Sequence, residues 1–142
     1  MLTVHKVVAY VVAADKLLVL LHPHHPEVGL QVPAGTIEIG ESPDMAVLRE
    51  LTEETGLIDF GKPEYLGEAS FDMTAFGRRQ IHHRLFFRVP FGGNTPTRWR
   101  HTETSGGNAQ PELFELFWVS LSSHPELIAE QGALLHALPR AA

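Results

Sequence analysis

The feature that most constrains the fold of this chain is one complete helix signal between Ser42 and Gly56. Ser42 is a favourable N-cap residue, and Pro43 suits the first helical position because an N–H there would have no helical partner. Asp44 places negative charge in the first turn, where the helix dipole favours it, and Gly56 is a typical residue for ending a helix. We therefore predict a helix over Pro43–Thr55.

Extended segments flank this helix on both sides. Thr3–Ala14 and Lys16–Leu21 are rich in apolar residues and are separated by a turn at Asp15, which indicates a hairpin or two neighbouring strands. Later in the chain we predict strands over Pro63–Met73, Gln80–Val89 and Leu113–Val119, a long loop over Phe91–Gln110 and a second helix over Pro125–Leu138. This order predicts an α/β fold, with a mixed β-sheet and helices packed on both of its sides. The length of 142 residues indicates a single domain, 1–142.

The composition excludes several classes of protein. The chain has no cysteine, so disulfides, thiolate metal sites and thiol nucleophiles are excluded. Its longest apolar run, Val7–Ala14, is far shorter than the roughly 20 residues needed to span a bilayer. The first residues show no basic segment followed by an apolar one, as a secretory signal would. We therefore expect a cytoplasmic protein without a membrane partner.

Charges of opposite sign are separated along the chain. The net charge is −6, and seven acids with a single base lie between Glu38 and Asp59. Six arginines and no acid lie between Met73 and Thr102. An acidic segment together with an arginine-rich one suits a site for a metal and phosphates, although two solvated surfaces would give the same pattern. The overall acidity and the absence of a helix or aromatic platform between the arginines argue against a nucleic-acid partner.

Three glutamates share one arc of the predicted helix. At 100° per residue, Glu50, Glu53 and Glu54 lie beside the apolar stripe that contains Val47 and Leu51. Carboxylates at these spacings repel one another, and a hard divalent cation with oxygen ligands would reverse that effect. The alternative is an ordinary solvated helix surface that binds no metal.

The run from Gly35 to Leu57 resembles the Nudix box. The fixed positions of that box are occupied here by Gly35, Glu41, Arg49, Glu50, Glu53, Glu54 and Gly56, and its two apolar positions by Leu51 and Leu57. The resemblance implies an α/β/α sandwich. It also implies a hydrolase that uses Mg²⁺ or Mn²⁺ to cleave the diphosphate linkage of a nucleoside diphosphate joined to another moiety.

The resemblance also implies roles for individual residues. Glu50, Glu53 and Glu54, with the backbone carbonyl of Gly35, would hold the metal, and Arg49 would orient Glu50. The general base would be either a glutamate of the box or one near the last strand. Glu112 is our preferred residue of the second kind, since it lies where the glycine-rich loop meets the predicted strand, although a solvated strand end would look the same.

Substrate contacts are less constrained by the sequence. Arginine binds phosphate well, so Arg78, Arg79 and Arg84 are the candidates for the substrate's phosphates, with a solvated hairpin as the alternative. Candidates for stacking on a base are Phe71, Phe76, Phe86 and Trp99. The expected partner is a small-molecule nucleotide, and a homodimer is an option. The alternative function is a non-catalytic, nucleotide-binding or regulatory module of the same fold.

Overall fold

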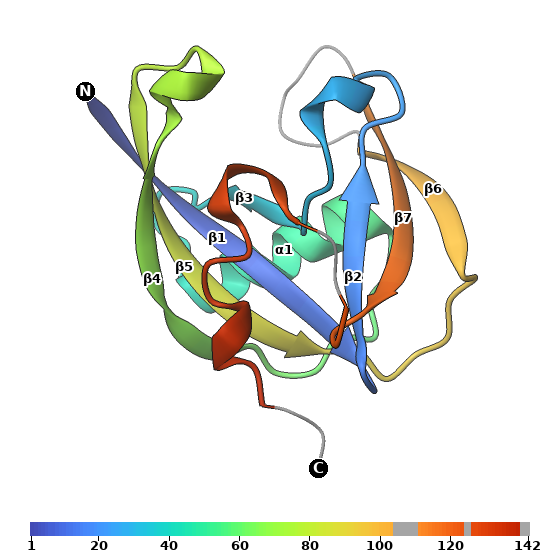
Figure 1. The fold of residues 1–142 in the computed structure, drawn as a ribbon. Coiled ribbons are helices and arrows are strands. Elements are labelled where there is room, and N and C mark those ends of the chain that lie inside the picture. The colour runs from blue at the N-terminus through green and yellow to red at the C-terminus, as the bar shows by residue number, and fades with distance from the viewer. Residues whose placement is uncertain (104–110, 124–125, 140–142) are drawn as a thin grey trace.

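A mixed β-sheet forms the centre of the molecule in the computed structural model, which describes residues 1–103, 111–123 and 126–139 (Figure 1). The sheet is ordered β4-β5-β1-β2-β7-β6, and β3 pairs with β1 off this path. The strands are β1 (Leu2–Ala13), β2 (Lys16–Leu21), β3 (Ala34–Thr36), β4 (Glu64–Asp72), β5 (Gln80–Pro90), β6 (Arg98–Glu103) and β7 (Glu112–Ser120). β1 and β5 run parallel, whereas the other pairs are antiparallel. The predicted strands before and after the helix are thereby confirmed.

Strand β1 separates two apolar cores because its side chains alternate between the two faces of the sheet. Val7, Ala9 and Val11 pack in the core beneath helix α1 (Pro43–Thr55). Val8 and Tyr10 belong to the core on the opposite face, which the C-terminal segment 126–139 covers. Figure 1 shows α1 behind the sheet and this segment in front of it. The predicted α/β/α arrangement of three layers is confirmed, although the front layer differs from the expected helix.

Helix α1 begins and ends at the predicted residues. The Ser42 hydroxyl accepts a hydrogen bond from the backbone N–H of Met45 at 3.2 Å, and Gly56 adopts a left-handed φ of 77° at the C-cap. An alanine there would be strained by that φ, and its Cβ would lie 2.8 Å from the His101 ring. None of the helices in residues 1–103, 111–123 and 126–139 is long and apolar enough to cross a membrane.

The predicted loop Phe91–Gln110 contains strand β6, so that prediction was wrong for residues 98–103. β6 is an edge strand in which exposed and half-buried residues alternate, and its exposed Arg98 and Arg100 both pair with Glu115 of β7. One face of this strand lies in solvent, so its sequence has no run of apolar residues that would have predicted a strand. Residues 104–110 of the predicted loop lie outside the described residues.

The predicted helix Pro125–Leu138 is also wrong as an α-helix. The segment forms two short 3₁₀ turns, η3 (Ile128–Glu130) and η4 (Leu135–Ala137). Ala129 and Glu130 have φ values of 54° and 57°, which lie in the left-handed region and interrupt a right-handed helix. The buried Tyr10 hydroxyl donates to the carbonyl of Gln131 at 2.5 Å. Contacts with the sheet thus hold a backbone conformation that the apolar spacing of the segment does not reveal.

Candidate metal centre and adjoining groove

Three carboxylates converge where α1 meets the end of β6. One carboxylate oxygen each from Glu50, Glu53 and Glu103 lies within 4.8 Å of the other two, and all three residues are half-buried. We call these three residues the carboxylate cluster. Sequence analysis missed Glu103 because it lies in the predicted loop. The available signal was its position directly after the acid-free arginine segment, which ends at Thr102.

Glu54 is separated from this cluster although it shares the same arc of α1. Its side chain is buried, and its Oε1 accepts a hydrogen bond from the backbone N–H of Ala34 in β3 at 3.0 Å. Burial raises the pKa of Glu54 well above its usual value, and the nearby Glu50 adds to this rise. The predicted trio is therefore divided, with Glu50 and Glu53 facing Glu103 and Glu54 facing β3.

Gly35 is required by the position of Glu50. A Cβ atom on Gly35 would lie 1.9 Å from the carboxylate carbon of Glu50, so any larger residue would displace that carboxylate. The structure thus brings together Gly35 and Glu50, two of the four predicted metal ligands. Burial raises the pKa of Glu50 to about 7, while the neighbouring Arg49 acts in the opposite direction.

Arg49 connects the cluster to the loop before α1. Its Nε and Nη2 donate to the two carboxylate oxygens of Glu41 at 2.6 and 2.9 Å. Its Nη1 donates to one oxygen of Glu50 at 3.0 Å and to one oxygen of Glu53 at 3.2 Å. Nη2 also donates to the backbone carbonyl of Thr36 at 3.0 Å. The guanidinium therefore fixes one oxygen of each of these two cluster glutamates.

The cluster has the ligand chemistry of a hard divalent cation. Mg²⁺ and Mn²⁺ prefer oxygen ligands, and carboxylates are the groups supplied here. Burial and the neighbouring carboxylates raise the pKa values of Glu50 and Glu103, so Arg49 compensates their ionised forms only in part. A divalent cation would supply that compensation, and the residues present fit one.

Glu112 lies at the outer edge of the cluster. It pairs with Glu103 in the register of β6 and β7, and it adds to the rise in the pKa of Glu103. Its Oε2 is 3.6 Å from Nδ1 of His22, and about half of its side chain is exposed. The structure therefore brings the predicted Glu112 next to the carboxylate cluster while leaving it open to solvent.

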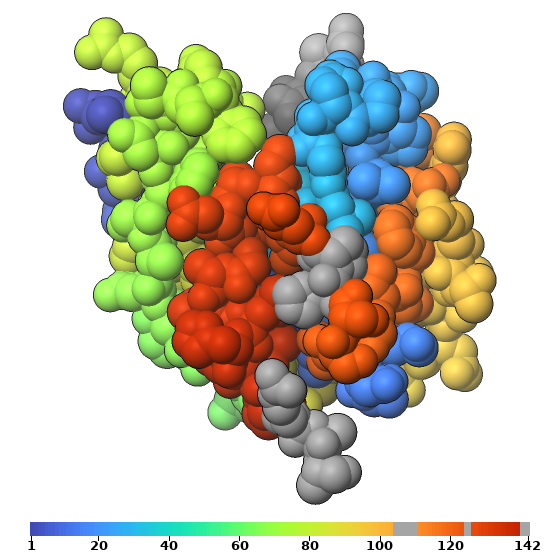
Figure 2. Space-filling view, viewed as in Figure 1, coloured from blue at the N-terminus to red at the C-terminus, as the bar shows by residue number. Residues whose placement is uncertain are grey.

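A groove of about 750 Å³ opens on the opposite face of the sheet, above the C-terminal segment. It lies between η1 (Pro26–Val28) and η2 (Met73–Phe76), and Figure 2 shows the molecule hollowed between these two segments. Phe71 and Phe76 line it with ring centroids 5.9 Å apart. Two of the four aromatic candidates for stacking thus line the groove, whereas Phe86 is buried in the core beneath it.

The three predicted phosphate-binding arginines have different environments. Arg78 and Arg79 are exposed, and the charge of Arg78 acts on Lys6 and His82. Arg84 is only 5% exposed, and its Nη1 donates to the carbonyl of Ala129. Its guanidinium also lies 4.8 Å from the centre of the Phe71 ring. Arg84 therefore lies beside Phe71 of the groove and beneath the C-terminal segment, and its contact with phosphate stays a prediction.

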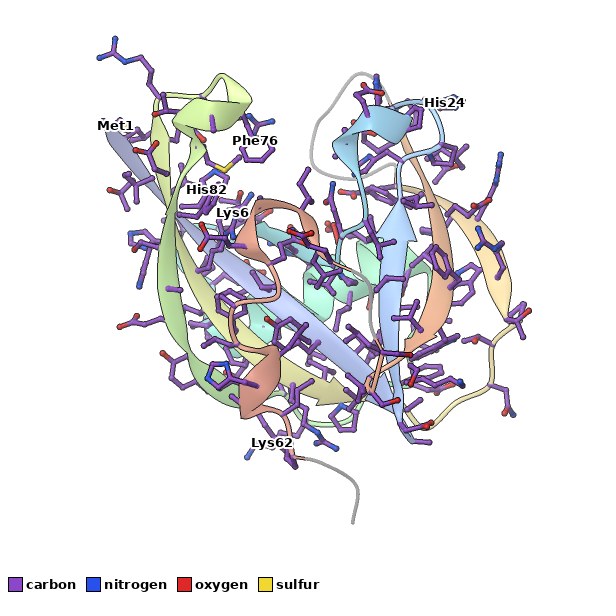
Figure 3. All side chains as sticks on the ribbon, viewed as in Figure 1. Met1, Lys6, His24, Lys62, Phe76 and His82 are labelled. Atoms are coloured by element: carbon purple, nitrogen blue, oxygen red, sulfur yellow. The ribbon has the colours of Figure 1, made fainter. Side chains whose placement is uncertain are left out.

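Lys6 is a residue of this region that sequence analysis did not select. It lies on the groove face of β1, and its Nζ donates to the Thr36 hydroxyl of β3 at 3.0 Å. Figure 3 labels Lys6 and His82 on the side of the molecule that β4 and β5 form, and the charge of Lys6 acts on His82. Burial lowers the pKa of His82 to about 4, so this histidine is neutral at neutral pH.

The fold and the site define a three-layer α/β/α protein whose helix carries an acidic cluster on its border with the sheet. The NUDIX domain model matches residues 3–138 of the sequence. The chain therefore belongs to the Nudix family, as the resemblance of Gly35–Leu57 predicted. It is a Nudix hydrolase. A comparison with curated proteins gave no match.

Solved structures of Nudix proteins share this fold. The MutT NUDIX hydrolase from Burkholderia pseudomallei is 20% identical with a TM-score of 0.66, and the match covers 98% of this chain and all of that one. The MutT protein from Methanosarcina mazei Go1 is 21% identical with a TM-score of 0.64, covering 95% and 91%. A UDP-X diphosphatase is 20% identical with a TM-score of 0.59; the match covers 96% of this chain but only 62% of that protein.

Proposed function

We propose that this protein is a divalent-metal-dependent hydrolase that cleaves the diphosphate bond of a nucleoside diphosphate joined to another moiety. Membership of the Nudix family supports pyrophosphate-bond hydrolysis in general. The observation that carries the finer proposal is the carboxylate cluster of Glu50, Glu53 and Glu103, which is crowded, half-buried and oriented by Arg49.

The residues that would hold Mg²⁺ or Mn²⁺ are the cluster glutamates, with Glu54 and the carbonyl of Gly35 beside them. When bound, the cation would neutralise negative charge on the phosphate oxygens and polarise the phosphorus–oxygen bonds. Arg49 keeps Glu50 and Glu53 in a fixed orientation, so the site is organised before substrate arrives. Gly35 leaves the space that the Glu50 carboxylate occupies.

Glu112 is the general base in this proposal. A base must accept a proton from the attacking water as the water adds to phosphorus, and Glu112 is half exposed at the edge of the cluster. Glu50 is the competing candidate within the box. Glu112→Gln separates the two: it should lower kcat by about a hundredfold if Glu112 is the base. A kcat within a few-fold of the wild-type value would assign the role to the box instead.

The substrate in this proposal is a small nucleotide derivative whose nucleoside part lies in the groove. The aromatic pair Phe71 and Phe76 provides the apolar surface on which a base stacks. Exposed Arg78 and Arg79 remain our candidates for contacts with the substrate's phosphates. Cytoplasmic localisation and a homodimer remain predictions of the sequence.

The decisive experiment is a panel of nucleoside diphosphate derivatives incubated with Mg²⁺ or Mn²⁺. Release of a nucleoside monophosphate supports the proposal. Glu53→Gln should abolish that release and leave the fold intact. Glu64→Gln is the matched control, because Glu64 is an exposed glutamate of β4 paired with Arg88, outside the carboxylate cluster. Tight nucleotide binding without product from any substrate would instead identify a non-catalytic binding module.

A further inference from the structure

We propose that Lys6 binds a phosphate oxygen of the substrate and so links the groove to the carboxylate cluster. This inference rests on the proposed function and names a residue that acts in the same site. It assigns the contact with the diphosphate to a lysine of β1, in addition to the arginines that follow β4.

The position of Lys6 follows from strand β3, which connects the two parts of the site. Gly35 of β3 lies against the carboxylate of Glu50, and the N–H of Ala34 binds Glu54. The next residue along β3 after Gly35, Thr36, accepts the hydrogen bond from Lys6 Nζ. One strand of three residues therefore carries contacts to the acidic region and to the ammonium group.

Strand β3 also lies where β1 and β2 separate. β1 and β2 pair only beside their turn, at Val12 with Leu17 and at Ala13 with Lys16. Farther along, the segment 31–36 runs between them, because Gln31 pairs with Leu20 of β2 and the carbonyl of Pro33 accepts a hydrogen bond from the N–H of Ala9 in β1. The segment continues into β3, which pairs with β1 from Lys6 to Val8. Lys6 therefore lies where β1 meets the strand that contacts Glu50 and Glu54.

The ammonium group of Lys6 has hydrogen-bond donors beyond the one that binds Thr36. A lysine ammonium has three donor hydrogens, and the hydrogen bond to Thr36 uses one of them. Within residues 1–103, 111–123 and 126–139, no carboxylate lies within ion-pair distance of Nζ. Lys6 is nevertheless half-buried, and burial lowers its pKa. An anionic ligand would compensate the buried charge.

The neighbouring groups favour phosphate as that ligand. Glu54 is bound to Ala34 and Glu50 to Arg49, and both act on Lys6 only at a distance. His82 is neutral and brings no competing charge. Between a base in the groove and a phosphorus at the cluster lies the diphosphate of a nucleotide, and lysine binds phosphate as a point charge.

A purely electrostatic role of Lys6 would give different binding data from a role in substrate binding. If Lys6 only neutralises Glu50 and Glu54, its removal should strengthen Mg²⁺ binding and leave the affinity for a diphosphate unchanged. If it binds the substrate, its removal should weaken diphosphate binding even when Mg²⁺ saturates the protein. The two roles therefore separate in a binding measurement.

The experiment is calorimetric titration of methylenediphosphonate, a base-free analogue that cannot be hydrolysed at its bridge, into protein saturated with Mg²⁺. The variants are Lys6→Met and Lys6→Arg, with Lys62→Met as the control, because Lys62 is exposed at the far end of the molecule (Figure 3). We expect Lys6→Met to weaken binding about tenfold or more, Lys6→Arg to retain part of the affinity, and Lys62→Met to change nothing. Melting temperatures of all variants establish that each is folded.

Unchanged affinity in Lys6→Met, or no binding of the analogue to the wild-type protein, would overturn the inference. Should Lys6→Met not fold, Lys6→Arg and Thr36→Val provide the test. The first replaces the ammonium with a guanidinium, the second removes the hydroxyl that holds Nζ, and both should weaken binding by a smaller factor. The measurement requires no turnover, so a protein that binds the analogue through Lys6 but hydrolyses nothing refutes the proposed function alone. If turnover is observed, Lys6→Met should raise KM more than it lowers kcat.

Discussion

Replacing Glu50 by glutamine should stabilise the metal-free protein, and the gain should depend on pH. Glu50 faces Arg49, Glu53 and Glu103, and burial is the largest cause of its raised pKa. Its side chain is 13% exposed, so solvent screens this effect little. A rise in pKa from 4.5 to about 7 corresponds to a penalty of about 3 kcal/mol for holding the ionised carboxylate in the folded state.

Proton linkage determines the sign of this change in the free energy of unfolding. Because the folded protein holds this proton more tightly than the unfolded chain, ionisation of Glu50 costs stability progressively as pH rises from 4.5 to about 7. Glutamine has no such cost, and its side-chain carbonyl can still accept the hydrogen bond from Arg49. Glu50→Gln should therefore raise the free energy of unfolding by about 3 kcal/mol at pH 8 and by less than about 1 kcal/mol at pH 5.

The assay is urea denaturation of both proteins in EDTA at a series of pH values, with Glu64→Gln as the control. Adding Mg²⁺ should then stabilise the wild-type protein, and should stabilise Glu50→Gln less, because the variant has lost an anionic ligand. A difference in unfolding free energy that stays constant between pH 5 and pH 8, or a variant less stable than wild type at pH 8, would refute the argument.

Three further substitutions test other parts of the structure. Gly35→Ala should lower kcat by about a hundredfold, since its Cβ would displace the Glu50 carboxylate; a kcat within threefold of wild type would contradict this. Arg49→Lys keeps the charge but loses the paired hydrogen bonds to Glu41, so steady-state kinetics should show at least a tenfold fall in kcat. Tyr10→Phe removes a buried hydroxyl that bonds the C-terminal segment, and urea denaturation should show a loss of about 1–2 kcal/mol, with no loss expected if that bond is irrelevant.

Local signals in the sequence were sufficient for helix α1. Its capping residues act within one turn, so Ser42 and Gly56 determined both ends without any knowledge of the tertiary structure. The helical period likewise placed Glu50 and Glu53 together, and the resemblance added Gly35. These relations involve residues close together in the chain, so they can be recognised in the sequence alone.

Long-range relations could not be predicted in this way. Glu103 joins the cluster because β6 pairs with β7, and a polar edge strand has no apolar period that reveals it. The direction of Glu54 depends on an N–H of β3. Arg84 resembles a surface cation in the sequence, but its bond to Ala129 buries it beneath a segment 45 residues away. Each of these features needs a partner that only the folded chain brings near.

The front layer of the sandwich consists of a segment that has no continuous helix to support its own shape. Its turns are maintained by side chains that rise from the sheet, namely the hydroxyl of Tyr10 and the guanidinium of Arg84. Glu50, Glu53 and Glu54, by contrast, lie on a capped helix on the reverse side, and Glu103 lies at the end of the edge strand β6. Substitutions in the front layer would consequently change the groove for the nucleoside without changing the carboxylate cluster. Under the proposed function, substrate preference and bond cleavage can diverge independently, because a single sheet stands between them.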